Sequence, residues 1–167
     1  MRVLGIDPGT SRTGWGLVEQ RGNRLAALDY GAISIPRDKP FCEKLVQLYG
    51  ELAGVLRRAR PDAAAIEDVF YGQNVRTALV MGQARGAAML AVAHAGVALY
   101  EYEPARVKKA VVGNGRAHKV QVQEMVRVLL GLAQVPEPDD AADALALAIC
   151  HCHRAEEAVP VRLRVRR

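Results

Sequence analysis

The sequence lacks most of the features that mark secreted or membrane-inserted proteins. It has only three cysteines, an odd number at spacings that suggest no disulfide framework, and this favours a reducing compartment. Its N-terminus leads straight into an apolar run, without the basic segment and apolar stretch of a secretory signal. Polar and charged residues interrupt the longest apolar region, 78–100, so no membrane span is expected. We therefore expect a cytoplasmic protein.

The 167 residues, half of them hydrophobic, suffice for one domain with a proper core and are too few for two of ordinary size. The formal net charge is +5, but the last eight residues, PVRLRVRR, hold four arginines and no acid. A near-neutral body can still bind nucleic acid, because phosphate needs only a local basic face. We expect one domain over residues 1–154 and a flexible Arg-rich tail over 155–167.

Apolar periodicity and turn-forming residues predict an α/β protein. The expected strands are 2–7, 14–20, 25–35, 63–69 and 98–102. Helices are expected between Pro40 and Pro61, over 75–95, after Pro104, over 119–130 and from Asp139. This order predicts a five-stranded mixed sheet with helices on both faces, in which the first and fourth strands form a parallel pair joined by a right-handed crossover.

Two acidic residues stand at the ends of predicted buried strands. Asp7 ends the run VLGID, and Glu67 ends the run AAAIE. If the two strands are neighbours, the carboxylates face each other, and like charges that close would raise a pKa unless a cation lies between them. A divalent metal is the simplest resolution.

The last predicted helix begins DDAADALALA, in which Asp140 and Asp143 are three residues apart and share a face. Aspartates are also common in the first turn of a helix, so a capping role and a site role carry equal weight for this segment. Asp7 before Pro-Gly is, taken singly, more typical of a turn. Glu67 interrupts a strand where another hydrophobic residue is expected, and such exceptions tend to mark functional sites.

Four carboxylates without cysteine or histidine suit Mg²⁺ or Mn²⁺ better than Zn²⁺. Two such ions, about 3.5–4 Å apart, can activate a water and stabilise the leaving oxygen in an in-line phosphodiester displacement. No protein nucleophile is then needed. The run Cys150–His153 resembles a metal motif, but on a continuous helix its side chains point in different directions, so small buried thiols are the better interpretation.

Five motifs together resemble one family, the RuvC-type Holliday-junction resolvases. In order and spacing they are GIDPGTSRTGWGL, AIEDVF, GQARGAAM, VKKAVVGNGRAHKVQVQEMV and DDAADALALAICHCH, and they span about 2–153. The resemblance implies an RNase H-like fold, a two-fold homodimer and paired nicks in four-way DNA junctions during homologous recombination and DNA repair. It implies two Mg²⁺ per active site, with Mn²⁺ able to substitute, and a branch-migration complex of RuvA and RuvB as partner.

Position by position, the resemblance places the catalytic, metal-binding acids on Asp7, Glu67, Asp140 and Asp143. Asp139 is the rival to Asp140, since four-residue spacing to Asp143 also shares a helix face.

The resemblance also assigns DNA contacts. It assigns Phe70 to stacking on junction bases, with Tyr71 beside it, and Lys108, Lys119 and Arg116 to the DNA backbone. By sequence alone the two aromatics are more typical of a hydrophobic plug, or of a dimer contact for Tyr71. The basic residues form either a phosphate-facing stripe or a solvated face.

Three alternatives remain. An actin-like ATPase shares the GIDPGTSRTG loop but needs a second phosphate loop and an adenosine motif, roughly a second domain. A non-catalytic junction-binding module would be expected to lack at least one of the four acids. Another RNase H-like nuclease, such as one that processes RNA, is disfavoured only by the helical region after Pro104.

Overall fold

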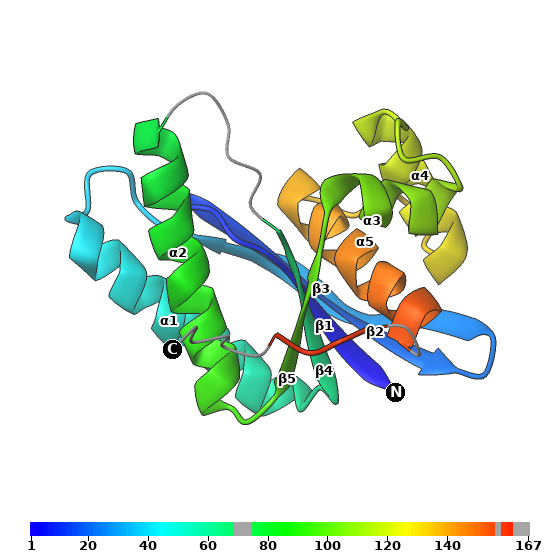
Figure 1. Cartoon of the computed structure of the whole chain (residues 1–167), viewed down its shortest axis with the longest axis horizontal. Helices are drawn as coiled ribbons and strands as arrows, with labels where there is room; N and C mark the ends of the chain where they lie inside the picture. Colours follow the sequence, from blue (N-terminus) through cyan, green and yellow to red (C-terminus); the bar gives the residue numbers. More distant parts are fainter. Residues whose placement is uncertain (69–74, 156–157, 162–167) are drawn as a thin grey trace, which may run out of the picture.

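The computed structural model of the chain describes residues 1–68, 75–155 and 158–161. Five strands form one sheet in the order β3-β2-β1-β4-β5 (Figure 1). The strands are β1 (Arg2–Asp7), β2 (Arg12–Arg21), β3 (Arg24–Ser34), β4 (Ala63–Glu67) and β5 (Ala98–Tyr102). The helices are α1 (Phe41–Ala59), α2 (Val75–His94), α3 (Pro104–Val112), α4 (Lys119–Leu130) and α5 (Asp139–Arg154).

The central strand β1 pairs antiparallel with β2 and parallel with β4. The predicted mixed sheet and the parallel pair of first and fourth strands are therefore confirmed. β4 is shorter than predicted, because Asp68 has already left the ladder and residue 69 lies outside the described residues. The parallel arrangement brings the C-terminal ends of β1 and β4, where Asp7 and Glu67 lie, to the same edge of the sheet.

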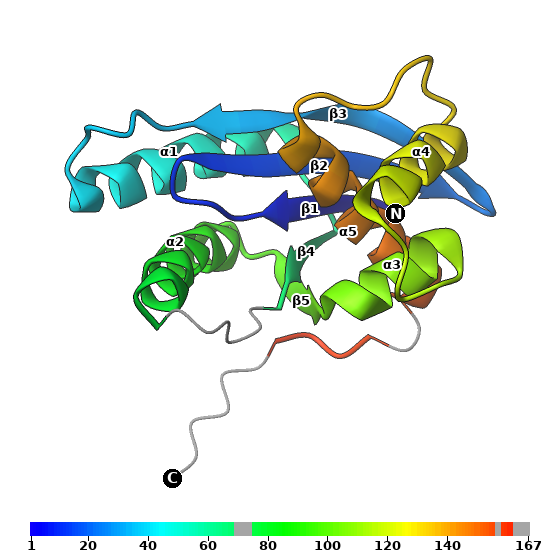
Figure 2. The same cartoon turned by 90° about the horizontal axis from the view of Figure 1, so that it is seen from above.

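Helices cover both faces of the sheet, as predicted (Figure 2). On one face α1 and α2 pack on β1 and β4, where Leu4, Ile6 and Ile66 are fully buried. On the other face α3, α4 and α5 enclose a second core around Val3 and Leu145. None of the helices in residues 1–68, 75–155 and 158–161 has the length and apolarity that crossing a membrane requires.

Glycines let α5 lie directly on the sheet. A Cβ atom on Gly5 would lie 1.8 Å from the carbonyl oxygen of Ala144, and one on Gly14 would lie 1.9 Å from that of Asp140. A Cβ on Gly16 would meet the Leu145 side chain at 2.6 Å. Contacts shorter than 3 Å do not occur between real atoms of this kind, so no other residue fits here without moving α5.

Beyond α5 the chain crosses the open edge of β5 (Figures 1 and 2). The side chain of Ala158 packs against the core that α5 helps to form. The backbone N–H of Val161 donates a hydrogen bond of 2.7 Å to the carbonyl oxygen of Leu99. Residues 158–161, which precede the Arg-rich end of the sequence, are thus attached to the sheet.

We expect Gly5→Ala to lower the free energy of unfolding by about 3 kcal/mol, because the new methyl group displaces α5 from the sheet. Urea denaturation followed by circular dichroism measures this. Gly50→Ala is the matched control, since Gly50 lies in α1 with open space around it. That control should gain about 0.5–1 kcal/mol. Equal effects of the two substitutions would contradict the close approach of α5.

Candidate active site

Two neighbouring strands present one acid each at their ends. Ile6 of β1 and Ile66 of β4 are register partners, so Asp7 and Glu67, the next residues along, lie side by side. Because side chains alternate along a strand and both isoleucines pack toward α1 and α2, both acids project toward α5. Each carboxylate is partly buried.

Residues of α3, α4 and α5 complete a cavity of about 370 Å³ in front of these acids. Its polar lining consists of Asp7, Glu67, Asp143, Lys108 and Lys119. Its apolar lining consists of Pro104, Val107, Val122 and Leu147. Three of the four predicted acids and two of the predicted basic residues therefore share one cavity.

The fourth predicted acid, Asp140, lies beside the cavity without lining it. Its carboxylate is 3.5 Å from the Arg12 guanidinium, and its charge contributes to raising the pKa of Asp7. Its rival Asp139 exposes 67% of its side chain, against 30% for Asp140. Asp140 is thus the less exposed of the two, and its assignment as a site residue in place of Asp139 stays a prediction.

The turn after Asp7 is fixed by Thr13, which is fully buried. Its hydroxyl donates a hydrogen bond of 2.9 Å to the carbonyl oxygen of Gly9 and accepts one of 3.1 Å from the N–H of Gly9. This closes the loop between β1 and β2 and brings Arg12 next to Asp140. Sequence reasoning had assigned no role to Thr13 or Arg12, because neither residue type is unusual in a Gly-rich turn.

Burial and mutual repulsion disturb the titration of the acids. Burial, together with the charges of Asp143, Glu67 and Asp140, raises the pKa of Asp7 to about 7. Burial and the Asp143 charge raise the pKa of Glu67, while Lys108 opposes them. Burial also raises the pKa of Asp143, against the hydrogen bond from Lys119. Such a cluster is stable as carboxylates only with added positive charge.

Within the described part of the chain, no three acidic, histidine or cysteine side chains converge as a ready-made metal cage. Three of the aspartates instead pair with cationic side chains: Lys119 lies 2.9 Å from Asp143 and 3.3 Å from Asp139, while Arg12 faces Asp140. The donor set is nevertheless hard, anionic oxygen, and its raised pKa values are what a divalent cation would reverse. The residues present therefore fit Mg²⁺ or Mn²⁺.

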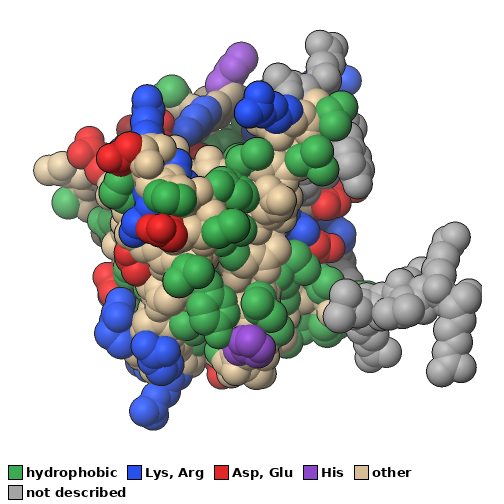
Figure 3. Space-filling model, turned by 90° about the vertical axis from the view of Figure 1, so that its left-hand side faces the viewer, with side chains coloured by type: hydrophobic (Ala, Val, Ile, Leu, Met, Phe, Trp, Pro, Cys, Tyr) green, Lys and Arg blue, Asp and Glu red, His purple; other side chains and the backbone are tan. Residues whose placement is uncertain are grey.

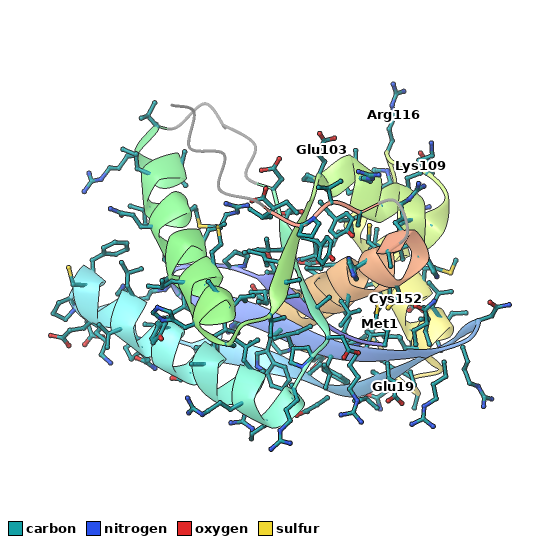
Figure 4. All side chains as sticks on the ribbon, turned by 60° about the horizontal axis from the view of Figure 1, so that its bottom comes forward. Met1, Glu19, Glu103, Lys109, Arg116 and Cys152 are labelled. Atoms are coloured by element: carbon teal, nitrogen blue, oxygen red, sulfur yellow. The ribbon has the colours of Figure 1, made fainter. Side chains whose placement is uncertain are left out.

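The other predicted DNA contacts are dispersed. Arg116 projects outward beyond the α3–α4 end of the molecule (Figure 4), and its backbone N–H donates a hydrogen bond of 3.0 Å to the Asn114 side chain. Phe70 and Tyr71 lie outside the described residues.

The position of Lys119 is a signal that sequence analysis could have used. Lys119 occupies the first turn of α4, where the charge of a cation is unfavourable to the helix dipole.

The Cys–His run belongs to the core at the far end of α5. Cys150 and Cys152 are buried free thiols, as the sequence interpretation expected. His151 is buried between Tyr100 and Tyr102, and the Tyr102 hydroxyl lies 2.6 Å from its Nδ1.

Known proteins resemble this chain over almost its whole length. The profile of the family described as "Crossover junction endodeoxyribonuclease RuvC" matches residues 3–151. The RuvC protein of Chloroflexus aggregans is 57% identical over 145 residues, which cover 87% of this chain and 88% of that protein. The chain belongs to the RuvC family. It is an endodeoxyribonuclease, and the predicted family and enzyme class are confirmed.

Solved structures of the family share the fold. The RuvC structure from Thermus thermophilus superposes with a TM-score of 0.87 at 37% identity, covering 96% of this chain and all of that one. A second structure, described as T. thermophilus RuvC in complex with Holliday junction substrate, has a TM-score of 0.88 at 35% identity and the same coverage. The predicted RNase H-like fold class is confirmed.

The raised pKa of Asp7 makes metal-free stability depend on pH. Between about pH 4 and 7 the folded state keeps a proton on Asp7 that the unfolded state has lost, so stability falls as pH rises through this window. We expect Asp7→Asn to be more stable than wild type at pH 8 by about 2–4 kcal/mol, with the difference disappearing near pH 4. Urea titrations with a chelator present measure it.

The exposed residue Asp38 supplies the control, because Asp38→Asn makes the same chemical change away from the cavity. Its stability should track that of wild type at both pH values. A destabilised Asp7→Asn at pH 8 would show that the acids do not repel one another as described.

Proposed function

We propose that this chain resolves four-way (Holliday) DNA junctions by paired, symmetric hydrolytic nicks, in homologous recombination and DNA repair. The observation that carries the proposal is the cavity in which Asp7, Glu67 and Asp143 meet beside two lysines. Support also comes from the T. thermophilus relative, which is described in complex with a Holliday junction substrate.

Asp7, Glu67, Asp140 and Asp143 would hold two Mg²⁺, or Mn²⁺ in its place. When bound, such ions activate a water and stabilise the oxygen that leaves. The chain's own part is to hold the acids in place: two sit at strand ends and two on a helix packed directly on the sheet. Lys119 pairs with one oxygen of the Asp143 carboxylate, and a cation held by Asp143 would compete with this ion pair. The ammonium group of Lys119 would then be available to a phosphate oxygen.

Basic residues would bind the DNA backbone around the cavity. Lys108 and Lys119 line the cavity itself and would contact the scissile phosphate. Arg116 lies farther out and suits the backbone of a junction arm. Stacking on junction bases by Phe70 and Tyr71 remains part of the proposal, since the segment that holds them follows directly on Asp68 at the end of β4.

A second copy of the chain would bind to α2. Small and apolar residues form a solvent-exposed stripe along one side of this helix: Val75, Leu79, Gly82, Gly86 and Leu90. Apart from the backbone of α2 itself, no heavy atom of the described residues lies within 4 Å of a Cβ built on Gly82 or Gly86, so a second helix can approach closely. Figure 3 shows hydrophobic side chains gathered over the side of the molecule that α1 and α2 form. The partners RuvA and RuvB are proposed from the family resemblance.

We expect wild type to nick a synthetic mobile four-way junction symmetrically with Mg²⁺ or Mn²⁺, in preference to duplex, single-stranded and RNA–DNA hybrid substrates. Asp7→Asn, Glu67→Gln and Asp143→Asn should each slow cleavage about a thousandfold or more, because several kcal/mol of transition-state stabilisation are lost. Denaturing gels of end-labelled junctions measure the rates, and gel shifts in Ca²⁺ should show binding retained. Asp38→Asn serves as the matched control.

Two results would overturn the proposal. Junction binding without cleavage in any divalent metal would favour a non-catalytic junction-binding module. Cleavage of an RNA–DNA hybrid without preference for the junction would favour another RNase H-like nuclease.

We expect Leu79→Asp to convert a dimer into a monomer, because a charge at the centre of the α2 stripe would be buried without a partner. Sedimentation velocity measures the change at micromolar concentration. Val128→Asp is the control, since Val128 is a similarly exposed residue on α4, on the opposite face of the sheet. A Leu79→Asp variant that still sediments as a dimer would place the interface elsewhere.

A further inference from the structure

An arginine of α2 reaches the end of the strand that carries Glu67. Arg85 Nε donates a hydrogen bond of 3.2 Å to the backbone carbonyl oxygen of Glu67. A terminal nitrogen of the same guanidinium forms an ion pair with Glu101 on β5. Arg85 thus connects α2, β4 and β5 at one point, and only 15% of its side chain is exposed.

Arg85 approaches Glu67 from the face of the sheet opposite to the cavity. Its helix neighbours Ala84 and Ala88 are fully buried in the core between α2 and the sheet, together with Ile66. The Glu67 carboxylate lies on the other face, where its pKa responds to burial, Asp143 and Lys108. The guanidinium therefore holds the backbone of Glu67, while the carboxylate stays available in the cavity.

The contact lies where the ladder ends. The register partners of β4 and β5 end with Glu67 and Tyr102, and the N–H of Asp68 donates a hydrogen bond of 2.9 Å to the carbonyl oxygen of Tyr102. The last residue of a strand has fewer ladder bonds to hold it than an interior residue. Arg85 adds a bond to Glu67 from a different element, which sets the position of its carbonyl group relative to α2.

A contribution to the stability of the fold does not by itself explain why an arginine occupies position 85. Burial lowers the pKa of Arg85, and Asp68 opposes the effect, which reflects the cost of taking the guanidinium out of water. The Glu101 side of the ion pair is 33% exposed, and an ion pair that solvent reaches adds little to the stability of a fold. A geometric role for the planar, multi-donor guanidinium accounts for the arrangement better.

We propose that Arg85 is a positioning residue that fixes Glu67 to α2 and so sets the geometry of one metal-binding acid. The inference rests on the proposed function, because it takes Glu67 as a metal ligand. It also connects the cavity to the helix whose outer stripe we propose as the dimer contact. The position of α2 is then transmitted to the active site through one side chain.

The test compares Arg85→Gln, Arg85→Lys and Glu101→Gln with Arg57→Gln, a control that makes the same change at an exposed position on α1. In Arg85→Gln we expect Mn²⁺ affinity, measured by calorimetry, to fall about tenfold or more. Higher Mg²⁺ should be needed for half-maximal cleavage, while junction binding in Ca²⁺ stays within about twofold of wild type. In metal-free protein the Asp68 amide should exchange faster with solvent.

Arg85→Lys should give an intermediate loss, because lysine keeps the charge for Glu101 but not the guanidinium's separate donors. Glu101→Gln should show a smaller shift in the same direction, and it replaces Arg85→Gln if that variant does not fold. In a Glu67→Gln background, Arg85→Gln should cause no further loss of Mn²⁺ affinity if Arg85 acts through Glu67.

Unchanged Mn²⁺ affinity in Arg85→Gln would overturn the inference. So would an equal further loss in the Glu67→Gln background, or a shift from dimer to monomer that accounts for the whole effect. The metal titrations do not depend on cleavage. A wild type that binds Mn²⁺ through Glu67 but does not cut junctions would overturn the proposed function alone, whereas junction cleavage unaffected by Arg85→Gln would overturn this inference alone.

Discussion

The backbone of α5 lies directly on β1 and β2, and the rest of the site depends on this contact. The sheet supplies Asp7 and Glu67, and the helix supplies Asp143 with Asp140 beside it. Because glycine stands where α5 crosses the strands, the helix-to-sheet distance is set by backbone atoms rather than by adaptable side chains. Any displacement of α5 would move two acids together, away from the two that the sheet holds. The close packing of α5 on the sheet therefore also sets the distances between the four acids.

This packing brings like charges together in a partly buried place, which works against folding. The pKa of Asp7 rises to about 7 because its neighbours and its burial both disfavour the carboxylate. Lys119 and Arg12 offset part of the repulsion by pairing with Asp143 and Asp140. A cation-binding site of this kind needs a balance of charge. Enough positive charge must lie among the acids for the chain to fold, and enough negative charge must stay unpaired to attract a metal ion.

Much of this arrangement could be predicted from sequence. Strand ends locate Asp7 and Glu67, because β-periodicity is readable locally and parallel neighbours end at a common edge. The reason why Gly5 and Gly14 are glycines could not be predicted, because a small residue within a strand does not reveal which element will cross it. The contact of Arg85 with Glu67 could not be predicted from the sequence either. It joins residues 18 positions apart through a carbonyl group, and no side-chain pattern encodes a backbone acceptor.

The crossing of β5 by residues 158–161 has a consequence for solubility. β5 is an edge strand, and a row of unpaired backbone groups at a sheet edge is a template on which another chain can add a strand. Val161 occupies the carbonyl oxygen of Leu99, while Pro160 beside it has no N–H with which to continue a ladder. The chain therefore occupies part of its own edge, and the proline makes this segment itself a poor template, which disfavours the addition of a strand from another copy.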